Sequence, residues 1–263
     1  MRLSDGEGER ESTSAKSLIP GVGMKQVVSP FGKYMAITSD TPMRTLNSSP
    51  WGGGYGLHRV LMNRQVDKTY NETDPLLEME AFIAREGLDP QDTAGMLTAA
   101  WVNDVGFNEL AWPLEEEESA KSEDDAASVG ETLRVSAWVT VGLGNKARAG
   151  AMLPASSLYP GTINTIVVIE GRLTDAAMVN AVITATEAKA AALQSMNITI
   201  NGQIATGTST DAVLIAATNR GTTYRYAGTA TTLGYLIGRT VHEAILVSGQ
   251  LYELAMSRRA AAQ

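Results

Sequence analysis

The sequence lacks cysteine entirely and contains only two histidines in 263 residues. The absence of cysteine excludes disulfide bonds, thiolate metal sites and a cysteine nucleophile. It leaves the cellular compartment open, because cysteine-free proteins occur in both oxidising and reducing compartments. Two histidines without a cysteine also argue against a zinc site, which is usually built from several nitrogen or sulfur ligands. We therefore expect no metal ion bound by the protein itself.

Basic residues are also scarce: 21 Lys and Arg stand against 29 Asp and Glu, which gives a net charge of -8. The stretch 115–125 supplies -6 of this charge, with seven acidic residues and one lysine. Without a basic surplus to neutralise phosphates, nucleic-acid binding is not expected. Because blocks of like charge repel and stay solvated, residues 115–130 are predicted to form a mobile loop inserted into the fold.

No hydrophobic run is long enough to span a membrane. The longest apolar region, residues 233–256, is interrupted by Arg239, His242 and Glu243, so membrane insertion is not expected. The polar N-terminus lacks the apolar segment of a secretory signal, and residues 1–24 are predicted to be a flexible tail. A cytoplasmic location is the default expectation.

The sequence does contain enough apolar residues, 44% of the total, to build a core, and residues 25–258 are predicted to form one domain. Proline and glycine punctuation predicts a helix from Asp74, and β-branched and aromatic residues predict strands. The predicted strands are 33–40, 44–49, 57–66, 93–102, 131–145, 161–171 and 204–218, and the last two alternate with helices at 174–195 and 231–259. This order predicts an α+β or layered α/β fold, with a mixed sheet packed with helices and a long C-terminal helix.

The predicted helix 174–195 has an apolar arc and an opposite, alanine-rich face, so both faces can be buried. The apolar arc consists of Met178, Val179, Val182, Ile183, Ala190 and Leu193. Asn180, Thr184 and Glu187 form a narrow polar stripe, and Lys189 lies at the edge of the arc. Buried charges are costly unless they are paired. Glu187 and Lys189 are therefore either a buried acid–base or substrate-orienting pair, or two side chains whose stems reach the surface.

Other polar motifs accompany glycine turns. The three glycines at 52–54 either allow a ligand to approach the backbone closely or make a tight turn between strands. Asn145 and Asn164 each lie beside a glycine turn, where an amide can hold a substrate or an oxyanion, or simply satisfy the turn. His58 is the only candidate for a catalytic imidazole, whereas His242 is expected to face solvent. Neither a phosphate-loop nor a GxGxxG motif is present.

Taken in order along the chain, several motifs together resemble the adenosylcobinamide amidohydrolase family. They include WGGG at 51–54, GTINTIVV at 161–168, TEAK at 186–189, TGTSTDA at 206–212 and YAGTATTLGYLIG at 226–238. TEAK and TGTSTDA are the most specific of these. The resemblance leaves out the N-terminal tail and the acidic insert.

The resemblance implies an amide hydrolase of corrinoid salvage, which cleaves the aminopropanol arm from adenosylcobinamide and releases adenosylcobyric acid. The corrinoid substrate carries the cobalt, so no separate cofactor is implied, and a homo-oligomer stays possible. Amide hydrolysis needs a nucleophile, oxyanion stabilisation and a proton for the leaving amine. As a hypothesis, Glu187 or Asp211 is the general base, Lys189, Asn145 or Asn164 stabilises the oxyanion, and the loop Thr206–Thr210 binds or attacks the substrate. The residues expected to bind substrate are Gly53, Gly54, Asn63, Asn145, Asn164, Thr206, Thr208, Ser209 and Thr210.

Two alternative functions stay open. A corrinoid-binding or carrier protein would keep the pocket without the chemistry. A self-processing threonine hydrolase or acyltransferase would cut its own chain before Thr162 or Thr208 and use the new N-terminal threonine as its nucleophile. Release of product tests the first alternative, and the intact mass of the chain tests the second.

Overall fold

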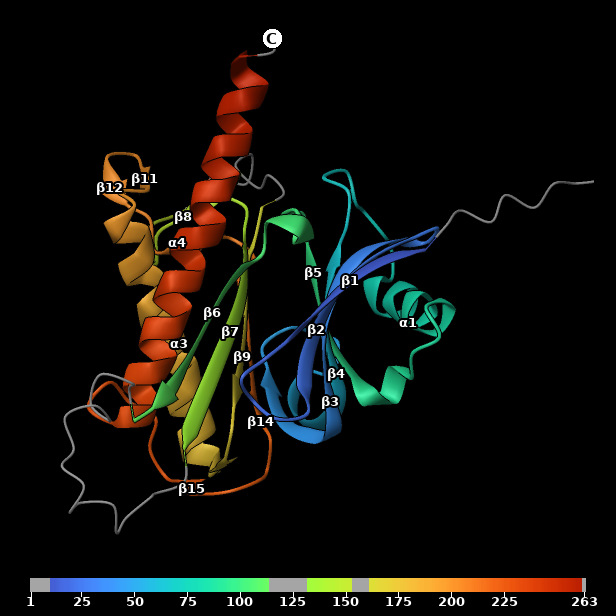
Figure 1. Cartoon of the computed structure of the whole chain (residues 1–263). Coiled ribbons are helices and arrows are strands. Elements are labelled where there is room, and N and C mark those ends of the chain that lie inside the picture. Colours follow the sequence, from blue (N-terminus) through green and yellow to red (C-terminus); the bar gives the residue numbers. More distant parts are fainter. Residues whose placement is uncertain (1–9, 114–131, 153–160, 262–263) are drawn as a thin grey trace, which may run out of the picture.

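A nine-stranded mixed sheet dominates the computed structural model, which describes residues 10–113, 132–152 and 161–261 (Figure 1). Its strands run in the order β1-β2-β3-β14-β9-β7-β6, and β4 pairs with both β3 and β5. They are β1 (Glu11–Lys16), β2 (Val22–Ser29), β3 (Gly32–Asn47), β4 (Gly54–Gln65), β5 (Thr93–Thr98), β6 (Gly106–Trp112), β7 (Leu133–Val141), β9 (Ile163–Ile169) and β14 (Ala212–Ala217). The predicted α+β architecture with a mixed sheet is confirmed.

The helices are α1 (Pro75–Arg85), α3 (Asp175–Ser195) and α4 (Thr232–Ala261), and short 3-10 turns cover Pro90–Asp92 and Val102–Asp104. The long C-terminal helix is therefore also confirmed. Three two-residue pairings complete the fold: β8 (Lys146–Ala147) with β13 (Gly207–Thr208), β10 (Arg172–Leu173) with β15 (Thr223–Tyr224), and β11 (Thr199–Ile200) with β12 (Gln203–Ile204). Along the described residues, no helix is both long enough and apolar enough to cross a membrane.

Three hydrophobic cores hold the layers together. The largest lies between α3 and α4 on one side and β7, β9 and β14 on the other. A second core joins two parts of the sheet. It contains Trp138 of β7 and Ile166 of β9 together with Met35 of β3 and Leu61 of β4. In the third, α1 packs its Phe82 against β3 and β4. Figure 1 shows the result: α3 and α4 cover one side of the molecule, and α1 covers the other.

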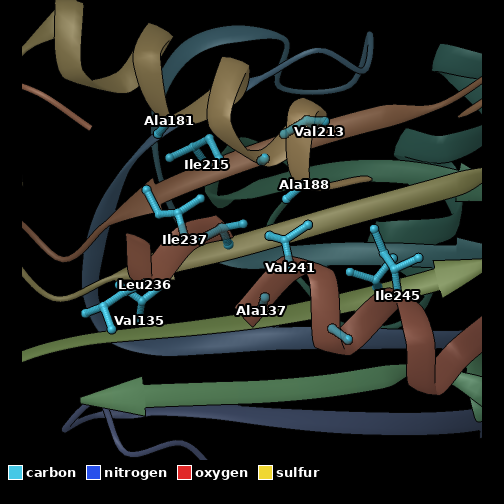
Figure 2. Close-up of a cluster of buried hydrophobic side chains, with 14 of the residues drawn as sticks. Val135, Ala137, Ala181, Ala188, Val213, Ile215, Leu236, Ile237, Val241 and Ile245 are labelled. Carbon is cyan, nitrogen blue, oxygen red and sulfur yellow. The ribbon is translucent and has the colours of Figure 1, made fainter. Parts of the chain in front are cut away.

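The burial of α3 differs from the predicted apolar arc. The helix begins where it was predicted, and Thr174 caps it, because its hydroxyl accepts the N–H of Ala177. However, Val179 and Ile183 are about half exposed, and it is the alanine-rich face that packs inward. Figure 2 shows Ala181 and Ala188 next to the β14 residues Ile215 and Val213, respectively. Small side chains let the helix approach the sheet closely, which a ranking of residues by hydrophobicity does not reveal.

The N-terminal part also corrects two predictions. The two short strands expected at 33–40 and 44–49 are one long strand, β3, whose pairing with β4 shifts register between Thr38 and Met43. The expected polar tail contributes an exposed strand, β1, which pairs with β2 across its whole length. Residues 1–9 of that tail, and the acidic stretch 115–130, lie outside the described residues.

One end of the sheet gathers the polar motifs. β9 and β14 are parallel, with Asn164 opposite Ala212, and β7 is antiparallel to β9, with Thr140 opposite Asn164. The first residues of β9 and β14 therefore meet the last residues of β7. The C-terminal half of α3 reaches the same end, where Lys189 contacts Asp211. We call this region the polar end of the sheet.

Candidate functional site

An ion pair between Lys189 of α3 and Asp211, directly before β14, lies at the centre of the polar end. Both side chains are about nine-tenths buried. The carboxylate also accepts the backbone N–H groups of Ile163 and Thr208, each at 3.0 Å, and the Thr208 hydroxyl. Donors to both oxygens hold the carboxylate in one orientation. Asp211 therefore ties the start of β9 and the loop before β14 to α3.

Gly207 explains how the ion pair fits under this loop. A methyl group on Gly207 would collide with the Asp211 carboxylate and lie 2.9 Å from the Lys189 ammonium nitrogen. Only a residue without a side chain allows the backbone to pass so close to the pair. The glycine in the TGTSTDA motif is thus required by the aspartate of the same motif.

Next to the pair, hydroxyl groups surround the peptide unit that precedes β9. The Thr210 hydroxyl donates to the carbonyl oxygen of Gly161 at 2.7 Å. Its oxygen lies 2.7 Å from the Thr162 hydroxyl oxygen. Because Thr210 uses its single proton on Gly161, Thr162 is the donor in that second bond. The order of donation is therefore Thr162 to Thr210 to the Gly161 carbonyl.

Two predicted amide side chains border these hydroxyls. Asn145, which follows β7, donates to the Ser209 hydroxyl at 2.6 Å, and Asn164 of β9 donates to the Asn63 side chain at 2.8 Å. Asn63 in turn donates to Thr140. The side-chain oxygens of Asn145 and Asn164 are buried and accept no hydrogen bond from any described residue. Buried polar atoms are usually satisfied, so unpaired acceptors are a feature of interest at a candidate site.

A cavity of about 370 Å³ opens onto the hydroxyl groups. Its lining comes from three separate parts of the chain: Val66, Asp67, Lys68 and Tyr70 after β4, Leu97, Thr98 and Ala99 at the end of β5, and Gly161, Thr162, Ser209 and Thr210. The volume is in the range of small-molecule sites. We take this cavity, together with the hydroxyl groups and the buried ion pair behind them, as the candidate functional site.

The structure brings together many of the residues expected from the sequence. Lys189, Asp211, Asn145, Asn164, Asn63, Thr208, Ser209 and Thr210 all lie at the polar end, within the hydrogen-bonded network described above. Thr206 lies at its margin, where its hydroxyl accepts the N–H of Ala149 at 2.8 Å. No described contact tests the catalytic or binding role of these residues, so those roles stay predictions.

Glu187, Gly53 and Gly54 are placed elsewhere. The Glu187 side chain is exposed and lines a groove between α3 and α4 that also includes His242, and no described contact links it to Lys189 or Asp211. Gly53 and Gly54 form the turn into β4 and do not line the cavity. Gly54 has a φ of 74°, which glycine adopts without strain. The tight-turn interpretation of the glycines therefore has direct structural support.

The histidines lie outside the cavity. His58 is buried, and its Nδ1 lies 2.8 Å from the Thr45 hydroxyl. Burial lowers the pKa of His58, and the nearby Asp92 carboxylate partly opposes that change. His242 is partly exposed on α4, beside Glu243. Neither imidazole contacts the Thr162 or Thr210 hydroxyl in the described structure.

The segment after β4 was missed as a candidate wall of the site. The Asp67 carboxylate accepts the N–H and hydroxyl of Thr69, which lower its pKa. Burial, followed by the charge of Glu78, raises the pKa of Tyr70 to about 12, so Tyr70 keeps its proton as a hydrogen-bond donor. VDKTY has no distinctive spacing, and only the pairing of β4 with β5 brings it to the cavity.

Among the described residues, no group of three or more histidine, aspartate or glutamate side chains is arranged to hold a metal ion. The expectation that the protein needs no cofactor of its own stays a prediction. What the site offers chemically is a set of hydroxyl and amide groups around a buried ion pair. Such groups are suited to nucleophilic attack and to stabilising an oxyanion.

Comparison with known proteins places the chain in a family. A family model for adenosylcobinamide amidohydrolase matches residues 23–112 and 120–255. Proteins named adenosylcobinamide amidohydrolase are similar: one from Methanosarcina mazei is 32% identical over 172 residues, 64% of this chain and 67% of that protein. Another, from Halobacterium salinarum, is 37% identical over 124 residues, 43% of this chain and 49% of that protein.

An uncharacterized protein from Methanocaldococcus jannaschii is also 36% identical over 100 residues, which are 37% of this chain and 38% of that protein. The matched segments thus span between 38% and 67% of the length of these three relatives. The family model, in contrast, covers most of the chain and includes every part of it that lines the cavity. The chain belongs to the adenosylcobinamide amidohydrolase family.

Proposed function

We propose that this protein hydrolyses the amide bond joining the aminopropanol arm to the corrin ring of adenosylcobinamide, giving adenosylcobyric acid for cobalamin salvage. The observation that carries the proposal is that both matched segments build one cavity. The first segment contributes the wall after β4 and the end of β5, and the second contributes the hydroxyl groups. Membership of the family and the chemistry of the cavity therefore support the same reaction.

The hydroxyl of Thr162 is the best-placed nucleophile for this reaction. It lines the cavity, it belongs to a largely buried residue, and its hydroxyl is oriented by donating to Thr210. As its oxygen attacks the scissile carbonyl, its proton passes to the leaving amine nitrogen, and water then hydrolyses the resulting ester. Asn145 contacts the cavity wall through Ser209, and its second side-chain N–H can polarise the scissile amide. Asn164 instead donates to Asn63 and to the Leu97 carbonyl, and so holds the wall in place. Removing one such oxyanion donor typically costs about 10²–10³-fold in turnover.

Lys189 and Asp211 take a positioning role in this proposal. All the donors around Asp211 fix its carboxylate, so it holds Ile163 and Thr208 in place instead of taking a proton from water. Glu187, at the groove between α3 and α4, takes no part in the chemistry. In this proposal, neither Glu187 nor Asp211 acts as the general base.

The size of the cavity defines which part of the substrate enters it. About 370 Å³ accommodates the aminopropanol arm and its amide, whereas the corrin ring with its adenosyl group stays at the mouth. Exposed Lys68 at the rim is then available to contact the ring's amide substituents, whereas the Tyr70 hydroxyl donates to Glu78 at 3.2 Å.

Incubation of the purified protein with adenosylcobinamide tests the proposal. The expected result is conversion to adenosylcobyric acid, which chromatography detects. Binding of the corrinoid without conversion, measured by a shift in its visible spectrum, would instead favour a carrier protein.

A further inference from the structure

The peptide bond between Gly161 and Thr162 has the surroundings of a bond that the protein cuts itself. We propose that this chain cleaves its own Gly161–Thr162 bond and so generates a second polypeptide that begins with Thr162. The cleavage concerns the chain's own backbone and does not depend on the corrinoid function proposed above.

The first argument is the hydrogen bonding of the peptide unit. The Gly161 carbonyl oxygen accepts the Thr210 hydroxyl at 2.7 Å, and Thr210 accepts the Thr162 hydroxyl at 2.7 Å. The nucleophile and the carbonyl that it would attack are therefore joined by one proton relay. The unit also borders the cavity, from which water can reach it.

The second argument is the close packing of other atoms around Gly161. A Cβ at this position would lie 2.5 Å from the side-chain oxygen of Asn145, 2.8 Å from the carbonyl oxygen of Gly142 and 2.9 Å from the amide nitrogen of Gly144. Atoms packed this closely hold the carbonyl in one orientation, and only glycine fits. The same packing places the unpaired Asn145 oxygen beside the bond.

The chemistry balances with water as the only co-reactant. The Thr162 oxygen attacks the Gly161 carbonyl carbon, and its proton passes through Thr210 to the carbonyl oxygen, closing a five-membered ring. Breaking the carbon–nitrogen bond with transfer of a proton to nitrogen gives an ester between Gly161 and the Thr162 side chain and frees the Thr162 amine. Water then hydrolyses the ester, leaving a Gly161 carboxylate and the free Thr162 hydroxyl.

Thr162 is favoured over Thr208, the other threonine at which the sequence allows cleavage. Thr208 lies in β13, and its hydroxyl donates to the Asp211 carboxylate. No described hydroxyl donates to the carbonyl before it. Thr208 therefore lacks the relay that surrounds Thr162. Its hydroxyl donates to Asp211 and lies 3.5 Å from the Gly161 carbonyl oxygen, which is not the carbonyl that precedes Thr208.

Cleavage at this position would not separate the two fragments. β9 begins immediately after the bond and pairs with β7 of the first fragment, while β14 of the second fragment pairs with β3 of the first. If the proposed amidohydrolase function holds, the freed amine of Thr162 can act as a base in that reaction. An α-amine with a pKa of about 7.7–8.0 beside the Thr162 hydroxyl is a suitable general base near neutral pH.

The intact mass under denaturing conditions, followed over time after purification, tests the proposal. We expect two fragments, residues 1–161 and 162–263, whose masses sum to the chain plus one water, together with a single associated particle under native conditions. Thr162→Ala should stay uncut and Thr162→Ser should be cut. Thr210→Val should slow the cut at least tenfold. Thr240→Val, the same change at a buried threonine of α4 whose hydroxyl donates to the Leu236 carbonyl at 2.8 Å, should be cut at the normal rate.

A wild-type chain that stays at 27.9 kDa on prolonged incubation, or is cut at another bond, would overturn the proposal. So would equal cleavage rates of the Thr210 and Thr240 variants, provided both show the cooperative melting of the folded protein. The outcomes separate from those of the corrinoid function: cut chains without corrinoid hydrolysis leave self-cleavage standing, and uncut chains that hydrolyse adenosylcobinamide refute it.

Discussion

At the scale of single residues, the sequence predicts that the buried Lys189 is paired, but it does not predict with which residue. Helix periodicity predicts that Lys189 needs a partner if it is buried, and Glu187, its neighbour on the same helix, was the predicted one. The partner is Asp211, which reaches Lys189 from the loop before β14. Helix periodicity identifies a charge that must be paired, but only tertiary packing selects the partner.

Replacing Asp211 with asparagine should destabilise the fold strongly. The change leaves the Lys189 ammonium buried without its counter-charge, and loss of one partner of a buried pair typically costs about 3–5 kcal/mol. Denaturant unfolding provides the measurement. Asp175→Asn is the matched control, since its pair with Arg44 is exposed, with the Asp175 side chain 74% accessible, and should cost at most about 1 kcal/mol. Similar losses for both variants would contradict the central role of Asp211.

Glu187→Gln should leave amide hydrolysis within about twofold of the wild-type rate, because the Glu187 side chain lines the groove between α3 and α4 and not the cavity. Turnover of adenosylcobinamide at saturating concentration is the measurement. A general base lost from the reaction would lower the rate by roughly 10²–10⁴-fold, and a drop of that size would return Glu187 to the mechanism.

His58 should make stability depend on pH. Burial lowers its folded pKa, so on acidification the unfolded chain takes up the proton first, near pH 6.5. Between that value and the lower folded pKa, the unfolded state binds more protons, and stability falls as the pH falls. One such group contributes a slope of at most about 1.4 kcal/mol per pH unit.

The measurement is denaturant unfolding of wild type and His58→Gln between pH 7.5 and about 5. The variant should lose less stability than the wild type on acidification. Parallel curves for the two proteins would show that His58 is not responsible.

At the scale of elements, periodicity located the helices and most strands but not always the faces that they bury. Helix 174–195 and the long C-terminal helix were predicted close to their observed bounds. Both faces of α3 were predicted to be open to burial. The alanine-rich face is buried, with Ala181 and Ala188 on the sheet, whereas Val179 and Ile183 of the apolar arc are about half exposed. β3 was split in two because its bulge interrupts the strand pattern.

Two glycines one turn apart on α4 should respond in opposite ways to alanine. At Gly234 a Cβ would collide with the Gly228 carbonyl, so Gly234→Ala should lower the free energy of unfolding by about 1–3 kcal/mol. At Gly238 the nearest atom lies 3.9 Å away, in Thr184, so Gly238→Ala should raise it by about 0.5–1 kcal/mol through the lower entropy of the unfolded chain. Thermal or denaturant unfolding of both variants decides the matter, and changes of the same sign would contradict the packing of α4.

At the scale of the whole molecule, the site is a product of topology. The cavity joins the segment after β4, the end of β5 and the hydroxyl groups before β9 and β14, which lie far apart in the chain. The motifs TGTSTDA and GTIN marked one wall, because their composition is unusual for the start of buried strands. The opposite wall has no such signature, and only the pairing of β4 with β5 and the packing between the halves of the sheet bring it there.

The central claim is that this cavity hydrolyses the amide of adenosylcobinamide, and the molar balance of the reaction tests it most directly. Wild-type protein incubated with adenosylcobinamide should release adenosylcobyric acid and aminopropanol in equal amounts, and Thr162→Ala, confirmed as folded, should release at least about 100-fold less. No product from the wild-type protein, or the same rate from the Thr162 variant, would contradict the account.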